Sequence, residues 1–267
     1  MNALQPTAGN LVIFDIYGPF AHFRKFYTNS SSLSYLVPPR TVLSGMMAGM
    51  LGLSSELFQG GGEKDYYPEF SPDKAFIAVS LMAPVRKLMQ TVNYLRTKTD
   101  SKKISFTDPT QIPLEILVPV QDEVRYRIYF AHENSAITSE LARRLRDRRF
   151  VYPLYLGLSE FIGEASVPMG VKKAEPVILQ EQQEKEVRSV CRVDAVGSLT
   201  TDEEYKFLSE LMPTGFESGR NPLPPKEYIV EMNAKKIKAV FQAGTELFRV
   251  EYSDLKGNDR SELIMAL

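Results

Sequence analysis

The sequence predicts an α+β protein whose larger part is a ferredoxin-like (RRM-like) βαββαβ domain with a long β-hairpin inserted in it. Two segments have the apolar spacing of helices, several others have the pattern of strands, and the two kinds alternate in the order of a split βαβ motif. The composition of the 267 residues, 43% hydrophobic and 24% charged, is that of an ordinary globular chain. This length fits one large domain or two small ones.

The first βαβ unit begins with residues 11–17, LVIFDIY, which predict a short buried strand because they are mostly β-branched or aromatic. Residues 18–37 have no clean period and predict a long loop. The Pro38-Pro39 pair then predicts a helix over residues 40–51, since proline suits a first helical turn. This helix is apolar on nearly every side and is expected to be buried, and residues 75–82 predict the next strand.

The second unit begins at residues 124–130, whose alternation predicts a strand with one face in the core and a basic, aromatic face opposite. Before it, residues 84–122 predict an extended β-hairpin that protrudes from the domain. Residues 138–150 predict a second helix with an apolar stripe, and a fourth strand is expected within residues 160–196. This order predicts an antiparallel sheet covered on one face by two helices.

The chain changes character after residue 196. The interpretation there is an acidic helix start over residues 200–211, a Gly/Pro loop and three strand-like runs. We therefore divide the chain into a domain of residues 1–196, with the hairpin at about 84–122, and a β-rich C-terminal extension or small subdomain of residues 197–267. The sequence leaves open whether the second part continues the first sheet.

Basic residues are concentrated in the first half, although the net charge is only −1. Residues 16–55 contain no carboxylate, residues 84–107 hold six Lys or Arg against one Asp, and residues 125–149 hold seven arginines against three carboxylates. Residues 175–267, in contrast, carry 12 basic and 17 acidic residues. If the basic runs converge on one surface, they favour a polyanionic partner; otherwise they are solvated faces.

Several classes of function are disfavoured by what the sequence lacks. It contains no Walker loop, no Rossmann glycine motif, no G-x-S-x-G and no metal-ligand histidine motif, so neither a cofactor nor a metal is expected. The single cysteine, Cys191, forbids an internal disulfide and a cysteine-based zinc site, in keeping with a reducing compartment. The longest nearly apolar run, residues 46–53, is too short to cross a bilayer, and the first ten residues lack signal-peptide features. We therefore expect a cytoplasmic protein with no membrane partner.

The loop of residues 18–40, GPFAHFRKFYTNSSSLSYLVPPR, interleaves aromatic and basic side chains. Basic groups neutralise phosphates and aromatic faces stack on unpaired bases, so this mixture is typical of a surface for single-stranded nucleic acid. The alternative is that the aromatic residues belong to the core and the basic residues to an ordinary surface.

The string FDIYGPFAHFRKFYTNSSSLSYLVPPRTVLSGMMAGMLGL closely resembles the N-terminal signature of Cas protein family five, in the form found in type I-B-like CRISPR effector complexes. A weaker similarity continues through YPLYLGLSEFIGEASV, residues 152–167. The resemblance implies a RAMP-type protein with a ferredoxin-like fold and a hairpin thumb. It also implies a Cascade subunit in antiviral defence, which binds the 5′ handle of the CRISPR RNA, caps the backbone filament, and contacts the backbone subunit, the large subunit and target DNA near that end.

The resemblance implies RNA-binding roles for residues on the signature, and charge and position add the hairpin. The candidates are His22, Arg24, Lys25, Tyr27 and Arg40, with Arg86, Lys87, Arg96, Lys98, Lys102 and Lys103 on the hairpin. Arg143, Arg144 and Arg146, on the predicted second helix, are candidates for contact with RNA, target DNA or another subunit. No catalytic residue is assigned.

Two other functions remain open. In the I-C branch of this family the protein is a metal-independent ribonuclease that processes repeat RNA, and such cleavage needs a base, an acid and a cation. His22, Tyr27 and Lys25, or His132 beside Glu133, are the candidates for these roles. Because the signature resembles the branch that carries a separate nuclease, we expect binding without catalysis. The third class is a protein-interaction module without nucleic acid.

Overall fold

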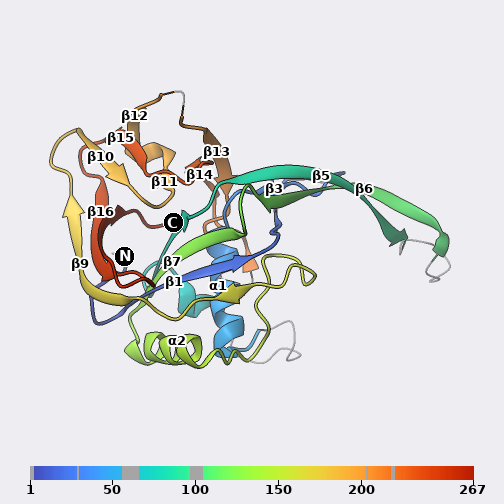
Figure 1. The fold of residues 1–267 in the computed structure, drawn as a ribbon, viewed down its shortest axis with the longest axis horizontal. Helices are drawn as coiled ribbons and strands as arrows, with labels where there is room; N and C mark the ends of the chain where they lie inside the picture. Colours follow the sequence, from blue (N-terminus) through green and yellow to red (C-terminus); the bar gives the residue numbers. More distant parts are fainter. Residues whose placement is uncertain (1–2, 29, 56–65, 97–104, 203, 218–219) are drawn as a thin grey trace.

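The computed structural model describes residues 3–28, 30–55, 66–96, 105–202, 204–217 and 220–267, with the backbone alone for 95–96 and 105–108. Within these residues the chain is a mixed α+β protein, rich in strands, with two α-helices (Figure 1). None of the described helices has the length and apolar character required to cross a membrane.

The first sheet has four strands in the order β4(Ala75–Leu81), β7(Val124–His132), β1(Leu11–Gly18), β8(Glu164–Ala165). Every neighbouring pair is antiparallel. The strands expected at residues 11–17, 75–82 and 124–130 are therefore confirmed. The fourth strand lies within the expected range but has only two residues.

Two helices connect these strands on one face of the sheet (Figure 1). Helix α1(Arg40–Leu51) joins β1 to β4 and spans the residues that the sequence predicted, with Gly52 in a left-handed conformation at its end. Helix α2(Ser135–Asp147) joins β7 to β8 and begins three residues before the predicted position. The reason is the Asn134 side chain, which caps the helix by accepting a hydrogen bond from the Ala136 N–H at 3.0 Å.

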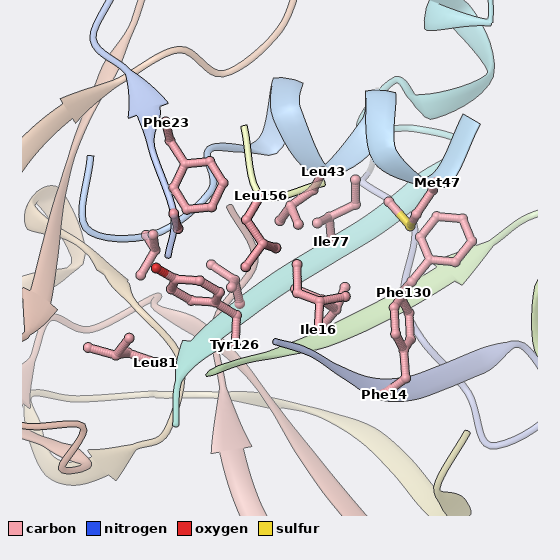
Figure 2. Packing of buried hydrophobic residues seen from close by; sticks show 14 of the residues in the cluster. Phe14, Ile16, Phe23, Leu43, Met47, Ile77, Leu81, Tyr126, Phe130 and Leu156 are labelled. Carbon is pink, nitrogen blue, oxygen red and sulfur yellow. The ribbon is translucent and has the colours of Figure 1, made fainter. Parts of the chain in front are cut away.

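Both faces of the first sheet are buried. On the helical face, Phe14, Ile16, Ile77 and Phe130 pack against α1 residues such as Met47 (Figure 2). On the other face, a second core includes residues of the C-terminal sheet. The second face of β7 is basic and aromatic as predicted, but the expectation that only one face of the strand lies in a core is wrong, because this face packs against a further layer.

The buried charge on this second face is compensated. Arg127 is almost fully buried and its guanidinium donates to both carboxylate oxygens of Asp15, at 2.8 and 3.1 Å, and to the Tyr252 hydroxyl at 2.7 Å. Burial tends to lower the pKa of Arg127, but the bonds to Asp15 outweigh it, and the net shift is upward. The arginine in the middle of β7 is thus part of the packing between the two sheets.

A long hairpin follows β4. Strands β5(Val85–Arg96) and β6(Ser105–Pro119) pair antiparallel from Val85–Pro119 outward, within the range of about 84–122 where the sequence predicted a hairpin. The pair extends away from the rest of the molecule (Figure 1).

The C-terminal half contains two further sheets. The larger has six strands in the order β12(Val196–Leu199), β15(Ile237–Phe241), β10(Gln183–Val187), β17(Asp259–Ile264), β16(Glu246–Ser253), β9(Gly170–Ile178). The smaller has the order β11(Cys191–Arg192), β14(Lys226–Glu231), β13(Phe207–Met212). Because β9 and β10 precede residue 197, the larger sheet draws strands from both sides of the predicted domain boundary. Two 3-10 turns, η1(Tyr67–Phe70) and η2(Val193–Ala195), complete the described elements outside the loop of residues 18–40.

The helix predicted over residues 200–211 is wrong in its described part. Residues 207–212 form β13, which pairs along its whole length with β14. Pairing with β14, the next strand in the sequence, has overridden the local helical pattern.

Candidate nucleic-acid interface

The loop of residues 18–40 contains a small two-stranded sheet, which the sequence analysis did not predict. Strand β2(Phe23–Arg24) pairs antiparallel with β3(Ser34–Tyr35). Backbone bonds hold this unit beside β6 of the hairpin. Ala21 and Leu117 exchange two N–H···O=C bonds, of 3.1 and 2.8 Å, and the Glu115 N–H donates to the Ser32 carbonyl at 2.8 Å. The basic, aromatic loop and the base of the hairpin therefore form one structural unit.

His22 lies inside this junction. Its side chain is only 2% exposed, its Nδ1 lies 2.7 Å from the Glu115 carbonyl oxygen, and its Nε2 lies 2.9 Å from the Ser32 hydroxyl. Burial lowers the pKa of His22, while the bond to the Glu115 carbonyl and its carboxylate act in the opposite direction. His22 joins the loop to the hairpin and does not present a surface to RNA, so its assignment as a direct RNA contact is corrected.

Two lysines of the predicted site are neutralised by carboxylates. Lys25 Nζ lies 3.0 Å from Glu210 Oε1, and Lys87 Nζ lies 3.2 Å from Glu115 Oε2 and 3.8 Å from Glu210 Oε1. We call Lys25, Lys87, Glu115 and Glu210 the junction ion cluster. Its two positive and two negative groups give no net charge, so these lysines contribute little to the attraction of phosphates.

The junction ion cluster also fixes backbone. The Glu210 side chain is fully buried, and its Oε2 accepts a 2.8 Å bond from the Leu36 N–H. Glu115 Oε2 accepts a 2.8 Å bond from the Ser34 N–H. Burial would lower the pKa of Lys25, but the ion pair with Glu210 outweighs it and the pKa is raised, so Lys25 stays charged. The cluster therefore ties the loop, the hairpin and β13 together.

One basic and two aromatic side chains that lie close together in the loop sequence are exposed. Arg24 is exposed on β2, and among the described residues its guanidinium makes one long bond, of 3.4 Å, to the Thr28 carbonyl. Phe26 is 55% exposed and Tyr27 49% exposed, and their rings meet edge to face with centroids 5.1 Å apart. We call Arg24, Phe26 and Tyr27 the exposed triad. It brings together one available cation and two available aromatic rings.

The structure describes the basic residues of the hairpin only in part. Arg86 is exposed near its base, where Leu88 and Met89 are also exposed. Lys98, Lys102 and Lys103 lie outside the described residues, and of Arg96 only the backbone is described. Arg86 is therefore a predicted RNA-binding residue of the hairpin whose side chain the structure places on the surface. It lies close to the loop of residues 18–40, because its strand partner Val118 follows Leu117, which bonds to Ala21 of that loop.

Arg40 is not on the surface. It is the first residue of α1, and its Nη2 donates to the carbonyls of Phe70 and Ala75 at 3.0 and 2.7 Å. Burial lowers its pKa to about 10. Arg40 fastens α1 to the segment before β4, and its assignment as a direct RNA contact is corrected.

The arginines of α2 do not join this site. Figure 1 places α2 well away from the hairpin. Arg143 and Arg144 both pair with Glu140, at 2.8 and 2.7 Å, whereas Arg146 is exposed. The bonds from Arg143 lower the pKa of Glu140 to about 2. Two of the three arginines are thus engaged in ion pairs within α2.

His132, the other candidate acid or base, is fully buried at the end of β7. Its Nε2 lies 2.7 Å from the Glu69 carbonyl oxygen, and its Nδ1 accepts a 2.9 Å bond from the Asn134 N–H. His132 therefore supports the chain just before α2. Both histidines of the sequence have their ring nitrogens occupied by partners within the protein.

Sequence reasoning missed three residues that define this site. Phe26 was visible in the aromatic loop but was not selected. Glu115 and Glu210 carry no local signal, because each meets its lysine across a long stretch of chain. No family model matches the chain, and no curated protein matches it.

Several solved structures resemble the chain in fold. A Cas protein crystal structure has 15% identity and a TM-score of 0.46, over 84% of this chain and 95% of that chain. A CRISPR RNA-guided surveillance complex contains a chain with 14% identity and a TM-score of 0.45, over 86% and 91%. A type III-B Cmr-beta complex bound to cognate target RNA and AMPPnP contains one with 11% identity and a TM-score of 0.45, over 85% and 86%. The structural neighbours are thus Cas proteins and CRISPR complex subunits, but at TM-scores below 0.5 they assign neither a subtype nor a role to this chain.

Proposed function

We propose that this chain is a subunit of a type I CRISPR effector complex that binds the 5′ handle of the CRISPR RNA and caps the backbone filament. The observation that carries the proposal is the exposed triad at the base of the hairpin. Arg24 offers a cation without a carboxylate partner among the described residues, and Phe26 and Tyr27 offer rings on which unpaired bases stack. The triad lies on the segment whose sequence resembles the signature of Cas protein family five.

The finer details of the fold are part of the same proposal. The strand order β4, β7, β1, β8, with α1 and α2 as the two connections, supports a ferredoxin-like domain. The β5–β6 hairpin corresponds to the thumb of RAMP proteins. Its base packs on the loop that carries the exposed triad, so RNA held by the triad would run toward the hairpin.

We assign a binding role and not a nuclease role. A metal-independent ribonuclease needs a base and an acid that reach the RNA. His22 and His132 are buried and bonded within the protein, and Lys25 is held by Glu210. Of His22, His132, Lys25 and Tyr27, only Tyr27 is exposed, and it supplies one of the three groups that the reaction needs.

The proposal is tested by titrating labelled repeat RNA of the host's CRISPR array with the purified protein, without metal, at several salt concentrations. We expect binding that weakens as salt rises, because phosphate contacts release counterions, and RNA that stays intact on a denaturing gel. Arg24→Ala should weaken binding and reduce the salt slope by about one, the amount of one phosphate contact.

A matched variant makes this test specific. Arg146→Ala removes an equally exposed arginine from α2 and should leave RNA binding unchanged. If Arg146→Ala weakens binding as much as Arg24→Ala, then the RNA surface is not the exposed triad. Cleaved RNA would instead favour the processing nuclease, and no binding at any salt would favour the protein-interaction module.

A further inference from the structure

A groove lies beside the RNA-binding loop, where β1 ends. Its walls come from the end of β1 and the turn after it, the turn between β6 and β7, and the segment before β8. It encloses about 490 Å³ and is lined by Tyr17, Gly18, Pro19, Asp122, Glu123, Glu160, Ile162 and Glu164. No part of the proposed RNA-binding triad lines it.

The groove has an apolar side. Ile162 is 69% exposed and is paired in a β-bridge with the exposed Tyr155. The neighbouring Phe161 packs on Phe20, which is itself exposed, with ring centroids 5.8 Å apart. Single exposed apolar residues are ordinary, but three that adjoin one groove mark an interaction surface. We call Phe20, Tyr155 and Ile162 the apolar patch.

The groove also has an acidic rim made by Asp122, Glu123, Glu160 and Glu164. Arg125 pairs with Glu123 and with Asp15, and Tyr17 donates a hydrogen bond to Glu164 at 3.3 Å. Within the described part of the chain, no Lys or Arg forms an ion pair with Asp122, Glu160 or Glu164. The rim therefore carries a surplus of negative charge that an occupant with positive charge would neutralise.

We propose that this groove docks a protein segment that combines Lys or Arg with an apolar side chain. Apolar side chains next to unpaired charged groups are the combination found in protein interfaces. RNA does not fit, because four carboxylates repel phosphates. The proposal goes beyond the RNA-binding role and does not depend on it, since the groove and the exposed triad share no residue.

The groove is connected to the RNA-binding loop through the backbone. The His22 N–H donates a 2.9 Å bond to the Leu156 carbonyl, and the Leu156 N–H donates a 2.7 Å bond to the Phe161 carbonyl within the same segment. The segment that bears Tyr155 and Ile162 is therefore part of the support of the loop. A protein docked in the groove would therefore contact the segment that supports the RNA-binding loop.

The test uses two short labelled peptides, one of alternating Arg and Leu and one of alternating Glu and Leu, together with a single-stranded RNA. Binding to the full chain is followed by fluorescence anisotropy at low and physiological salt. The Arg-Leu peptide should bind in a salt-dependent way. Glu160→Gln combined with Glu164→Gln should weaken its binding about tenfold, which corresponds to about 1.4 kcal/mol. Ile162→Ser should weaken it as well, because an apolar contact is lost.

The matched control is Glu181→Gln combined with Glu186→Gln, which removes two exposed carboxylates far from the groove. It should leave peptide binding unchanged. An equal loss in this control, or no loss in Ile162→Ser, would mean that the peptide binds by general charge, and would overturn the proposal. Preference for the Glu-Leu peptide would overturn it too.

Two further outcomes separate the other occupants. If sedimentation shows a dimer that the Glu160/Glu164 variant abolishes, then the groove binds a second copy of this chain and the proposal fails. If that variant instead raises or abolishes RNA binding, the groove belongs to the RNA path and the proposal also fails. If the full chain binds the Arg-Leu peptide but does not bind RNA, only the RNA-binding function proposed for the exposed triad is refuted.

Discussion

Removing the charge of Glu210 should destabilise the fold and loosen the RNA-binding loop. Glu210 is fully buried, faces Lys25 at 3.0 Å and Lys87 at 3.8 Å, and holds the Leu36 N–H. Glu210→Gln keeps an acceptor for Leu36 but leaves Lys25 without a counter-charge. Breaking a buried ion pair in this way typically costs about 3–5 kcal/mol.

The expected cost here lies below that range. The Lys25 side chain is partly exposed and reaches solvent, and Lys87 keeps its bond to Glu115 at 3.2 Å. We therefore expect Glu210→Gln to lower the free energy of unfolding by about 2–3 kcal/mol. For a chain of this size, that loss corresponds to a fall of about 4–12 °C in Tm.

Urea unfolding measures this loss as a shift in midpoint with an unchanged m-value. The control is Glu184→Gln, because Glu184 pairs with Lys238 on the surface at 3.3 Å and such pairs contribute at most about 1 kcal/mol. A second variant, Lys25→Met with Glu210→Leu, should lose less than the sum of the single changes, because it leaves no buried charge unpaired. If the free energy of unfolding of Glu210→Gln lies within about 0.5 kcal/mol of that of the original chain, the junction ion cluster does not stabilise the fold and the reasoning is refuted.

Three more predictions follow from single contacts. Folding lowers the pKa of His22, so burying its neutral form contributes stability above the unfolded pKa of about 6.5, and this stability is lost as the pH falls below that value. His22→Gln should therefore weaken the dependence of Tm on pH in thermal melts between pH 5 and 7, and an unchanged dependence of Tm on pH would contradict a buried, neutral His22. Asn134→Ala should cost about 1 kcal/mol in urea unfolding, because it removes the cap of α2, whereas a cost below about 0.3 kcal/mol would show that the cap is dispensable. Gly157→Ala should cost more than about 3 kcal/mol or prevent folding, because its φ is +97° and a Cβ would lie 1.7 Å from the His22 carbonyl oxygen. The control is Gly9→Ala, whose Cβ would meet nothing within 4 Å, and similar stability of the two variants would contradict the close approach.

The sequence predicted best where a pattern is local. Residues 11–17 and 40–51 carry their own signals, a β-branched run in the first case and a proline pair with an apolar helix in the second, and both elements were correct. The helix predicted over residues 200–211 failed because residues 207–212 pair with β14, and this pairing overrides their local helical pattern. The basic face of β7 was misread for a similar reason, since Asp15 and Tyr252 arrive from other strands to satisfy Arg127.

The candidate site divides in the same way. Sequence identified the right loop, since charge and aromatic content are properties of composition. It could not separate Arg24, which is exposed, from Lys25, which is held by a carboxylate 185 positions further along the chain. Nor could it show that His22 and Arg40 are buried, because each satisfies its polar atoms with carbonyl oxygens of remote segments.

The most direct test of the central claim is ultraviolet cross-linking of the purified protein to its repeat RNA, with the cross-linked residues identified by mass spectrometry. The account predicts cross-links on Phe26 and Tyr27, because these exposed rings stack on bases. The cross-links should disappear in Arg24→Ala/Phe26→Ala/Tyr27→Ala while Tm stays nearly unchanged. Cross-links that map to α2, or that persist at full yield in this variant, would contradict the assignment of the RNA-binding surface.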